Sequence, residues 1–459
     1  MNFPKKLREA RLQSPLQLST NYGDDIANFV DEHSYIPLNL VQRLSVSALQ
    51  SGQENHQEIT EDNEIEQRNF GGFLLSGPRE KVAFKGDEVR AGLVTCGGLC
   101  PGLNDVIRSI VHCLWYRYQV RNIVGFRYGY YGLGKVGSQS HPPLALTPEM
   151  VEHIHHLGGS FLGSSRGRPD LAEQIETLRR LRINQLYCIG GDGTMRGASA
   201  LAELLKSEGI NLHVIGVPKT IDNDIPFVEK TFGFETAVAK AVEAVRAAKI
   251  EANSGLRGVG LVKLMGRHAG FIAAHAAIAS READLVLVPE LPFKFGSLTD
   301  GQQGILPYLE QVLIEKGNAV VIIAEGVGQG QSQQPVFSNL VDTDASGNQK
   351  LGDVGLVLKE YLVTHFAEAK RSINLKYIDP SYMIRATTVN SADAHFAAQL
   401  AEDAVHAAMS GYSETLIGSW GGVGTLVPFS MLKQSKQLNL DRQVWRQALE
   451  ATGQPSILI

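Results

Sequence analysis

From about residue 89 onward the sequence repeats one pattern: a short apolar strand, a glycine-rich turn and a helix. Residues 91–95 form the first predicted strand, Gly97, Gly98 and Gly102 the turn, and residues 104–115 a helix with one apolar face. Strands that alternate with helices predict parallel sheets built from βαβ units. The same reading predicts strands at 123–126, 186–189, 213–217, 258–264, 285–288 and 319–324, and helices at 148–158, 170–182, 197–205, 234–249 and 268–279. An α/β fold with two such sheets is therefore expected.

Composition narrows the class of protein. The chain has 459 residues, of which 43% are hydrophobic and 20% charged, and this balance is typical of a soluble globular protein with two or three domains. The net charge of −5 argues against nucleic-acid binding. No apolar run is long enough for a membrane span, and the start of the sequence lacks the pattern of a signal peptide, so we expect a cytoplasmic protein without membrane partners. Four cysteines favour a reduced compartment over disulfides.

Residues 1–88 differ from the rest of the chain, with few glycines and a polar acidic stretch at 53–66. We interpret them as an N-terminal extension with helices at 24–32 and 38–50 and a flexible segment. The sequence does not tell us what the extension does.

Several predicted strands end in groups that suit phosphoryl transfer. This chemistry needs cations and backbone donors around phosphates, a metal, and a group that positions the attacking hydroxyl. Of the two neighbouring carboxylates Asp222 and Asp224, one can act on a hydroxyl while the other stays near a metal. A helix cap or a tight turn explains any single cluster equally well, but five such clusters in one α/β chain favour a site. The five are Gly97-Gly98, residues 158–166 with Arg166, Asp192 beside Gly193, residues 219–224, and Met265-Gly266-Arg267.

Three other patterns in the sequence resemble functional motifs but are explained without a binding site. Residues 132–137 match a dinucleotide-binding fingerprint, but prolines come where a helix should begin, so we expect only a glycine-rich loop at 129–137. His153, His155 and His156 are expected on a solvated helix face. Cys96 and Cys100 lack the second ligand pair of a zinc site.

The clusters together resemble those of 6-phosphofructokinases over about residues 89–430. The resemblance rests on residues 95–104, Gly190-Gly191-Asp192-Gly193-Thr194, residues 218–224, residues 233–237 and Met265-Gly266-Arg267. Residues 377–385 are similar to the plant and trypanosomatid branch, which also carries an N-terminal extension. The Gly-Gly-Asp-Gly run alone also occurs in diacylglycerol and NAD kinases, which lack the Thr-Ile-Asp-Asn-Asp run.

The resemblance implies the phosphofructokinase fold: two Rossmann-like domains with parallel-rich sheets flanked by helices, after the N-terminal extension. The implied boundaries are 89–235 plus about 386–440 for the phosphoryl-donor domain, 236–385 for the sugar-phosphate domain, and 441–459 for a C-terminal tail. It also implies a homo-oligomer, a tetramer or a dimer, in which Lys376 and Arg257 act across a subunit interface. The sequence does not identify the effectors of an allosteric site.

The resemblance assigns a role to each site residue. Asp222 would be the base for the 1-hydroxyl of fructose 6-phosphate, Asp192 would hold Mg²⁺, and Arg166 would bridge the transferred phosphoryl group, with Lys219 and Thr220 beside it. The phosphoryl donor would contact Gly97, Arg166, Gly193 and Thr194. The sugar phosphate would contact Thr220, Asp222, Asp224, Met265, Gly266, Arg267, Glu325, Lys376, Tyr382 and Arg385.

Two residues bear on the choice of donor. Lys219 is shared with pyrophosphate-dependent relatives, whereas Gly193 matches the ATP-dependent enzymes, because the pyrophosphate users carry aspartate there. A second carboxylate at position 193 would oppose an α-phosphate, while a lysine suits either donor. We therefore expect an ATP-dependent 6-phosphofructokinase of glycolysis that makes fructose 1,6-bisphosphate and ADP. The pyrophosphate-dependent enzyme is the alternative, and a non-enzymatic subunit is disfavoured because Asp192, Asp222 and Asp224 are all present.

Overall fold

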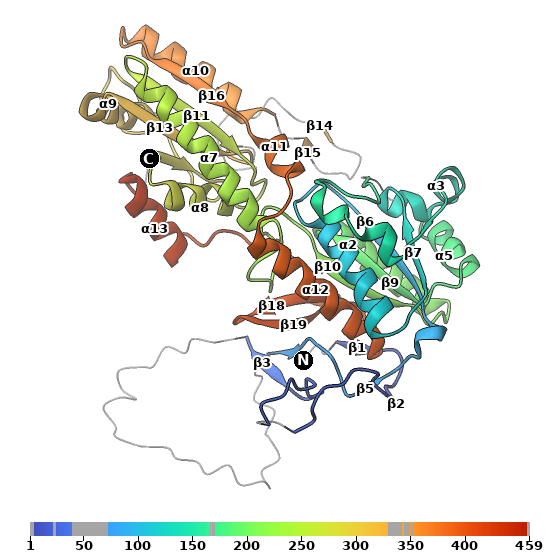
Figure 1. Ribbon diagram of the computed structural model, residues 1–459. Coiled ribbons are helices and arrows are strands. Elements are labelled where there is room, and N and C mark those ends of the chain that lie inside the picture. Colours follow the sequence, from blue (N-terminus) through green and yellow to red (C-terminus); the bar gives the residue numbers. More distant parts are fainter. Residues whose placement is uncertain are drawn as a thin grey trace, which may run out of the picture.

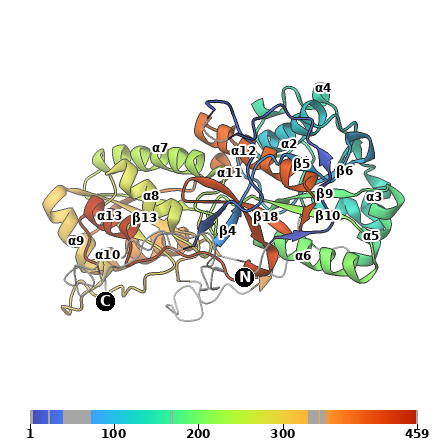
Figure 2. The ribbon, with the colours of Figure 1, turned by 90° about the horizontal axis from the view of Figure 1, so that it is seen from below.

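The computed structural model describes residues 4–21, 24–38, 72–165, 167, 170–328, 342–343, 349–350 and 352–456. Two helix-flanked sheets lie side by side within these residues (Figures 1 and 2). No helix among them is both long and apolar enough to cross a bilayer.

The larger sheet has nine described strands, in the order β3-β4-β19-β18-β10-β9-β6-β7-β8. Its five central strands, from β18 to β7, pair in parallel, whereas the outer strands pair antiparallel. The bounds are β3 Tyr35–Pro37, β4 Gly72–Leu75, β6 Arg90–Thr95, β7 Asn122–Phe126, β8 Leu144–Ala145, β9 Gln185–Gly190, β10 His213–Pro218, β18 Thr415–Trp420 and β19 Val423–Pro428.

The smaller sheet is parallel throughout its described strands, in the order β12-β13-β11-β16. Its strands are β11 Gly258–Leu264, β12 Leu285–Leu287, β13 Asn318–Ala324 and β16 Asn374–Ile378. Three antiparallel pairs stand apart: β1 Lys5–Lys6 with β17 Tyr412–Ser413, β2 Leu12–Gln13 with β5 Lys81–Val82, and β14 Asp342–Thr343 with β15 Gln349–Lys350.

Helices cover both faces of the larger sheet. Successive side chains of a strand point to opposite faces, and in β9 Tyr187 and Ile189 join the apolar cluster of α2 and α12, while Leu186 and Cys188 join that of α5 and α6. The helices are α2 Leu103–His112, α3 Lys135–Ser140, α4 Pro148–Val151, α5 Leu171–Arg180, α6 Asp192–Ser207, α7 Phe234–Asn253, α8 Phe271–Ser280, α9 Ile305–Lys316, α10 Val354–Glu368, α11 Ser381–Ala386, α12 Ser391–Met409 and α13 Gln443–Thr452, with short 3₁₀ segments η1 Gly86–Glu88, η3 Gly129–Leu133, η4 Ile154–His156 and η6 Phe429–Met431, and one π-helical turn, η2 Cys113–Arg117.

Parallel pairing places the predicted clusters at shared edges. In the larger sheet Thr95 of β6 lies opposite Ile189 of β9, and Gly190 lies opposite Pro218 of β10, so the loops after these strands leave from one edge. In the smaller sheet Leu264 of β11 lies opposite Ala324 of β13. The segments that come after each of these strands therefore meet where the two sheets face each other.

The predicted α/β architecture is confirmed, and the structure corrects several local predictions. Residues 24–32 contain no helix, because Asp24 folds back on Ser19 and the chain bridges at Asn28. The helix predicted at 148–158 stops after Val151, and the expected loop at 129–137 contains η3 and the start of α3. Residues 39–50 of the second predicted helix and the predicted flexible stretch 53–66 lie outside the described residues.

The end of the chain contributes to both halves. The segment from α12 to β19 completes the larger sheet, and α13 packs on α8 beside the smaller one (Figure 1). The predicted domain boundaries stay a prediction.

Candidate active site

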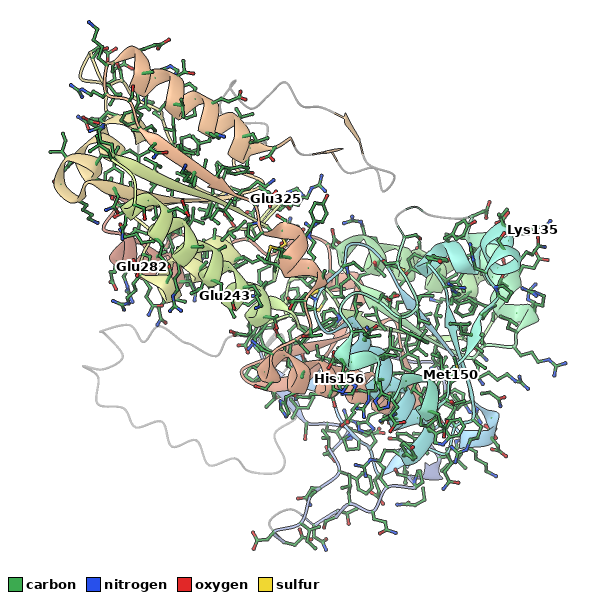
Figure 3. All side chains as sticks on the ribbon, turned by 45° about the horizontal axis from the view of Figure 1, so that its top comes forward. Lys135, Met150, His156, Glu243, Glu282 and Glu325 are labelled. Carbon is green, nitrogen blue, oxygen red and sulfur yellow. The ribbon has the colours of Figure 1, made fainter. Side chains whose placement is uncertain are left out.

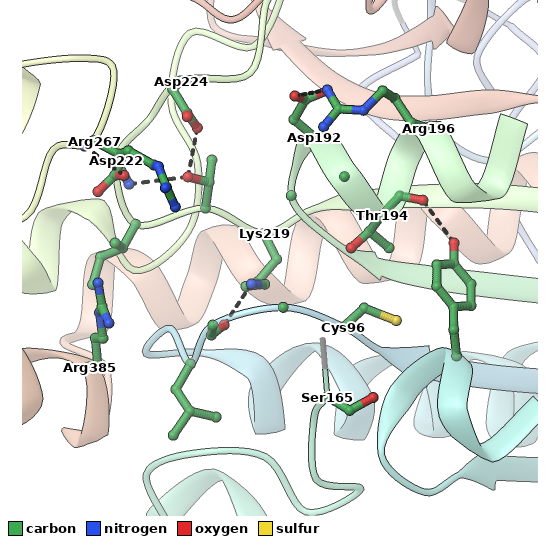
Figure 4. Close-up of a pocket in the computed structure, with 18 of the residues that line it drawn as sticks. Cys96, Ser165, Asp192, Thr194, Arg196, Lys219, Asp222, Asp224, Arg267 and Arg385 are labelled. Atoms are coloured by element: carbon green, nitrogen blue, oxygen red, sulfur yellow. Dashed lines mark hydrogen bonds and ion pairs between the residues drawn. The ribbon is translucent and has the colours of Figure 1, made fainter. Parts of the chain in front are cut away.

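A pocket of about 260 Å³ lies where the carboxyl ends of the two sheets face each other. Asp192 and Arg196 lie at one end of it and Asp222, Arg267 and Arg385 at the other, with Lys219 between them (Figure 4). It brings together eleven of the residues that the sequence predicts for the site: Gly97, Asp192, Gly193, Thr194, Lys219, Thr220, Asp222, Asp224, Arg267, Glu325 and Arg385.

The first wall is the loop after β6. Gly97 has a φ of +84°, which the absence of a side chain permits, and a Cβ there would lie 3.2 Å from Nζ of Lys219. Nζ of Lys219 donates to the carbonyl oxygen of Gly98 at 2.6 Å, and Ser164 Oγ donates to the carbonyl oxygen of Gly97 at 2.6 Å. Lys219, itself only 5% exposed, therefore joins the loop after β10 to the loop after β6.

The second wall is the start of α6. The sequence predicted this helix from residue 197, but it begins at Asp192, directly after Gly191 as N-cap. Gly190 has to be small, since a Cβ there would lie 2.1 Å from Thr194 Oγ1. Tyr130 OH donates to the carbonyl oxygen of Thr194 at 2.8 Å and holds η3 against the helix. The first turn of α6 thus lines the pocket, and the start of a helix attracts phosphate.

Gly193 lies inside this first turn with a normal backbone conformation. A Cβ built there would have Nη2 of Arg196 as its nearest neighbour, at 3.8 Å, which is ordinary contact distance. Neither packing nor backbone geometry therefore requires glycine at this position. What the missing side chain does is leave the pocket open beside Asp192.

The third wall, residues 219–224, is held by its own hydrogen bonds. Thr220 Oγ1 donates to Asp224 Oδ1 at 2.7 Å and accepts from the backbone N–H of Asp222 at 3.2 Å. Asn223 has a φ of +55°, and its Oδ1 accepts from Lys436 Nζ at 3.1 Å. This conformation turns the Asn223 side chain away from the two carboxylates that flank it.

Asp222 is the most unusual carboxylate of the pocket. Its Oδ2 accepts from the backbone N–H of Arg267 at 3.4 Å, and its buried Oδ1 has no hydrogen-bond partner in the structure as described. Burial raises the pKa of Asp222, and the charges of Asp224 and Glu325 raise this pKa further. Arg385 and the Arg267 N–H act in the opposite direction. A carboxylate with one unpartnered oxygen and a raised pKa is suited to take a proton from a bound hydroxyl.

The fourth wall belongs to the smaller sheet. Arg267 follows β11 and Glu325 follows β13, and Nη2 of Arg385 on α11 lies 3.9 Å from Oε1 of Glu325. Glu325 lies close to where the two halves meet (Figure 3). Gly266 turns the chain with a φ of +130°, and Met265 is fully buried behind the pocket surface.

Other predicted residues lie elsewhere. Lys376 on the edge strand β16 is exposed and does not line the pocket, and Tyr382 on α11 is 84% exposed. Arg257 forms an ion pair with Glu310 in the same chain. Arg166 lies outside the described residues, although its neighbours Ser165 and Gly167 line the pocket.

The sequence analysis missed Arg196, which lines the pocket and forms an ion pair with Asp192. The signal was available, because an arginine four residues after Asp192 faces the same side of a helix that begins at Asp192. Tyr130 and Leu99 were also missed.

The buried cysteines are not suited to act as nucleophiles. All four are buried and free, and burial raises the pKa of both Cys96 and Cys100 to about 12, which keeps these thiols protonated. Among the described residues no group of three or more His, Cys, Asp or Glu is arranged to hold a metal by itself.

Comparison with known proteins identifies relatives over most of the chain. The family model for phosphofructokinase matches residues 90–408. The chain is 45% identical over 387 residues to the ATP-dependent 6-phosphofructokinase of Amycolatopsis methanolica, covering 84% of this chain and 83% of that one. It is 46% identical over 383 residues to the enzyme of the same name from Trypanosoma brucei brucei, covering 82% and 76%. With the ATP-dependent 6-phosphofructokinase 7 of Arabidopsis thaliana it shares 43% identity over 84% of this chain and 78% of that one.

Solved structures agree on the fold. A pyrophosphate-dependent phosphofructokinase from Marinobacter aquaeolei matches with a TM-score of 0.62 at 20% identity, over 79% of this chain and 91% of that one. The Pichia pastoris phosphofructokinase in the T-state matches with a TM-score of 0.59 at 21% identity, over 80% and 38%. At such identities the structures establish the phosphofructokinase fold alone. Together with the family match, they place this chain in the phosphofructokinase family.

Proposed function

We propose that this protein is an ATP-dependent 6-phosphofructokinase, which transfers the γ-phosphoryl group of ATP to the 1-hydroxyl of fructose 6-phosphate in glycolysis. The observation that carries the proposal is the pairing of Asp222, with its buried unpartnered oxygen, and Asp192 in one pocket lined by glycine backbone and cations. The names of the relatives, at 43–46% identity, support the reaction and the donor.

The sugar phosphate would bind on the side of the smaller sheet. Arg267 and Arg385 supply positive charge there, and the carboxylate of Glu325 would accept hydrogen bonds from sugar hydroxyls. The 1-hydroxyl would then approach Asp222, which takes its proton as the oxygen attacks phosphorus, while Thr220 holds the loop that positions this carboxylate.

The donor would bind on the side of the larger sheet. The glycine backbone of the loop after β6 and the first turn of α6 line this side of the pocket, and Lys219 adds a fixed positive charge. Because phosphoryl transfer leaves the protein little covalent chemistry to perform, such positioning supplies most of the catalysis.

Mg²⁺ fits the residues that are present. The pocket lacks a protein-only metal site within the described residues, yet Mg²⁺ binds through one or two carboxylates together with water and substrate phosphates. Asp192, whose side chain is one third exposed to the pocket, would be its protein ligand. When bound, the ion would neutralise charge on the donor phosphates.

Gly193 supports ATP over pyrophosphate. The open space at this position leaves room for an α-phosphate, and an aspartate would fill it with negative charge. The fold does not separate the two donors, because a pyrophosphate-dependent phosphofructokinase shares it with a TM-score of 0.62.

Coupled assays with each donor test the proposal. We expect fructose 1,6-bisphosphate to form with MgATP and not with pyrophosphate, and turnover with pyrophosphate alone would overturn the choice of donor. Asp222→Ser should lower kcat by about 10²–10⁴-fold, because general-base catalysis contributes this much. Near-normal turnover of Asp222→Ser would remove its role as base.

We also propose a cytoplasmic homo-oligomer, a tetramer or a dimer, with allosteric control. The exposed positions of Lys376 and Tyr382 leave both side chains free to reach a neighbouring subunit. Light scattering of the purified protein would give the number of subunits, and a monomer that is fully active would contradict the proposal.

A further inference from the structure

Arg196 is a pocket cation to which the proposed reaction gives no part. It lies one helical turn after Asp192 on α6, and Nη1 donates to Oδ2 of that carboxylate (Figure 4). Nη2 lies 3.8 Å from the place where a Cβ on Gly193 would stand. The guanidinium therefore covers the space that the glycine leaves open.

The arginine occupies a carboxylate oxygen that a metal ion would also need. A divalent cation at Oδ2 of Asp192 would repel the guanidinium and take its place. The Arg196 side chain is 52% exposed, so the ion pair is solvated and contributes little that would resist this exchange.

The other described pocket cations lie elsewhere. Nζ of Lys219 donates to the carbonyl oxygen of Gly98, while Arg267 and Arg385 lie at the Asp222 end of the pocket (Figure 4). Arg196 is thus the described pocket cation that stands beside both Gly193 and Asp192 and can move when Asp192 is taken. A planar guanidinium released next to a nucleotide is suited to bidentate contact with a phosphate.

We propose that Arg196 is a donor-specificity residue: it leaves Asp192 when the metal–nucleotide complex binds and then contacts the non-transferred phosphates. This inference rests on the proposed function, since it assumes a nucleotide donor. It also gives Gly193 a second role. An aspartate at position 193 would hold the guanidinium in its present place, so that Arg196 would no longer be available to the nucleotide.

Binding measurements on the whole protein test the exchange. Arg196→Gln removes the charge from an exposed site, Arg196→Lys keeps it without the fork geometry, and Lys206→Gln removes a charge from the last turn of the same helix as a control. We expect Arg196→Gln to bind a non-hydrolysable ATP analogue with Mg²⁺ about tenfold more weakly, because a charge-assisted hydrogen bond is lost. Arg196→Lys should fall between this variant and the natural protein, and Lys206→Gln should match the natural protein.

A second measurement separates this exchange from a loss of structure. Mn²⁺, followed by its electron paramagnetic resonance without nucleotide, should bind several-fold more tightly to Arg196→Gln, because Asp192 is then free. Fructose 6-phosphate should bind unchanged. Opposite changes in metal and nucleotide affinity would support the exchange, whereas unchanged affinity for either the analogue or Mn²⁺ would overturn it. If the natural protein binds pyrophosphate but not the analogue, the proposed donor fails first and the inference fails with it.

Discussion

Nζ of Lys263 on β11 lies 2.7 Å from Oδ2 of Asp379, the carboxylate that precedes α11. The same ammonium lies 3.3 Å from Asp353, and Asp379 also accepts from the backbone N–H of Ser381 at the start of α11. This buried lysine therefore ties the smaller sheet to the helix that carries Arg385 into the pocket.

Lys263→Met should weaken sugar binding more than it slows the chemical step. Two partly buried carboxylates would lose their counter-charge and push α11 away, so we expect KM for fructose 6-phosphate to rise about tenfold with a smaller change in kcat. The free energy of unfolding should fall by about 1–3 kcal/mol, because the partly buried carboxylates lose a hydrogen-bond donor. Lys240→Met, which removes an exposed pair with Glu243, is the control and should change neither quantity. Steady-state kinetics and urea denaturation would decide, and an unchanged KM would contradict the link to α11.

The raised pKa of Asp222 predicts that activity is lost on acidification at an unusually high pH. This loss is the acid limb of the profile of kcat/KM against pH. The base has to be deprotonated, so kcat/KM should rise with pH through its pKa, above the ordinary range of an aspartate. Asp224→Asn removes a charge that raises this pKa and should move the limb to lower pH, whatever it does to the maximal rate. Glu243→Gln serves as the distant control. A limb that stays in place or moves to higher pH in Asp224→Asn would refute the assignment.

A second carboxylate links stability to pH. Asp403 on α12 accepts from Ser76 Oγ at 2.6 Å, and burial raises its pKa to about 6. Because the folded protein holds this proton more tightly than the unfolded chain, stability should fall as pH rises from about 4 to about 6. Asp403→Asn keeps an acceptor for Ser76. This variant should reduce the fall in the free energy of unfolding over this pH range by up to about 3 kcal/mol. Melting temperatures at pH 4.5 and 7, with the exposed Asp441→Asn as control, would test it, and equal losses in both variants would speak against it.

Gly266→Ala should disturb the loop that carries Arg267. A methyl group at a φ of +130° would meet the carbonyl oxygen of Ala269 at 2.6 Å, and the strain is worth about 1–3 kcal/mol. We expect a lower melting temperature and a higher KM for fructose 6-phosphate. Gly209→Ala is matched to it, because Gly209 also has a positive φ but nothing within 4 Å. If both variants behave alike, the clash with Ala269 has no effect on binding.

The sequence predicted most accurately the strands that are covered on both faces of their sheet. The strand at 258–264 appears with the same bounds as β11, because a run covered on both sides has to be apolar throughout. The carboxylates and glycines at strand ends were also found, since parallel pairing alone gathers them.

Contacts between distant segments were harder to predict. Nothing local to Ser76 indicates its bond to Asp403, and nothing near Tyr35–Pro37 indicates pairing with β4. Arg196 was missed because the start of α6 was placed five residues too late, which hid its alignment with Asp192.

The N-terminal strands β3 and β4 determine which strand edge of the larger sheet is covered. β4 pairs with β19, and β3 pairs with β4, so the extension continues the larger sheet at one side. A chain shortened to begin at Val89 would leave the backbone groups of β19 open to solvent, and open strand edges of this kind template pairing between molecules. β3 and β4 of the extension, for which the sequence offered no role, thus cover a strand edge that would otherwise be open.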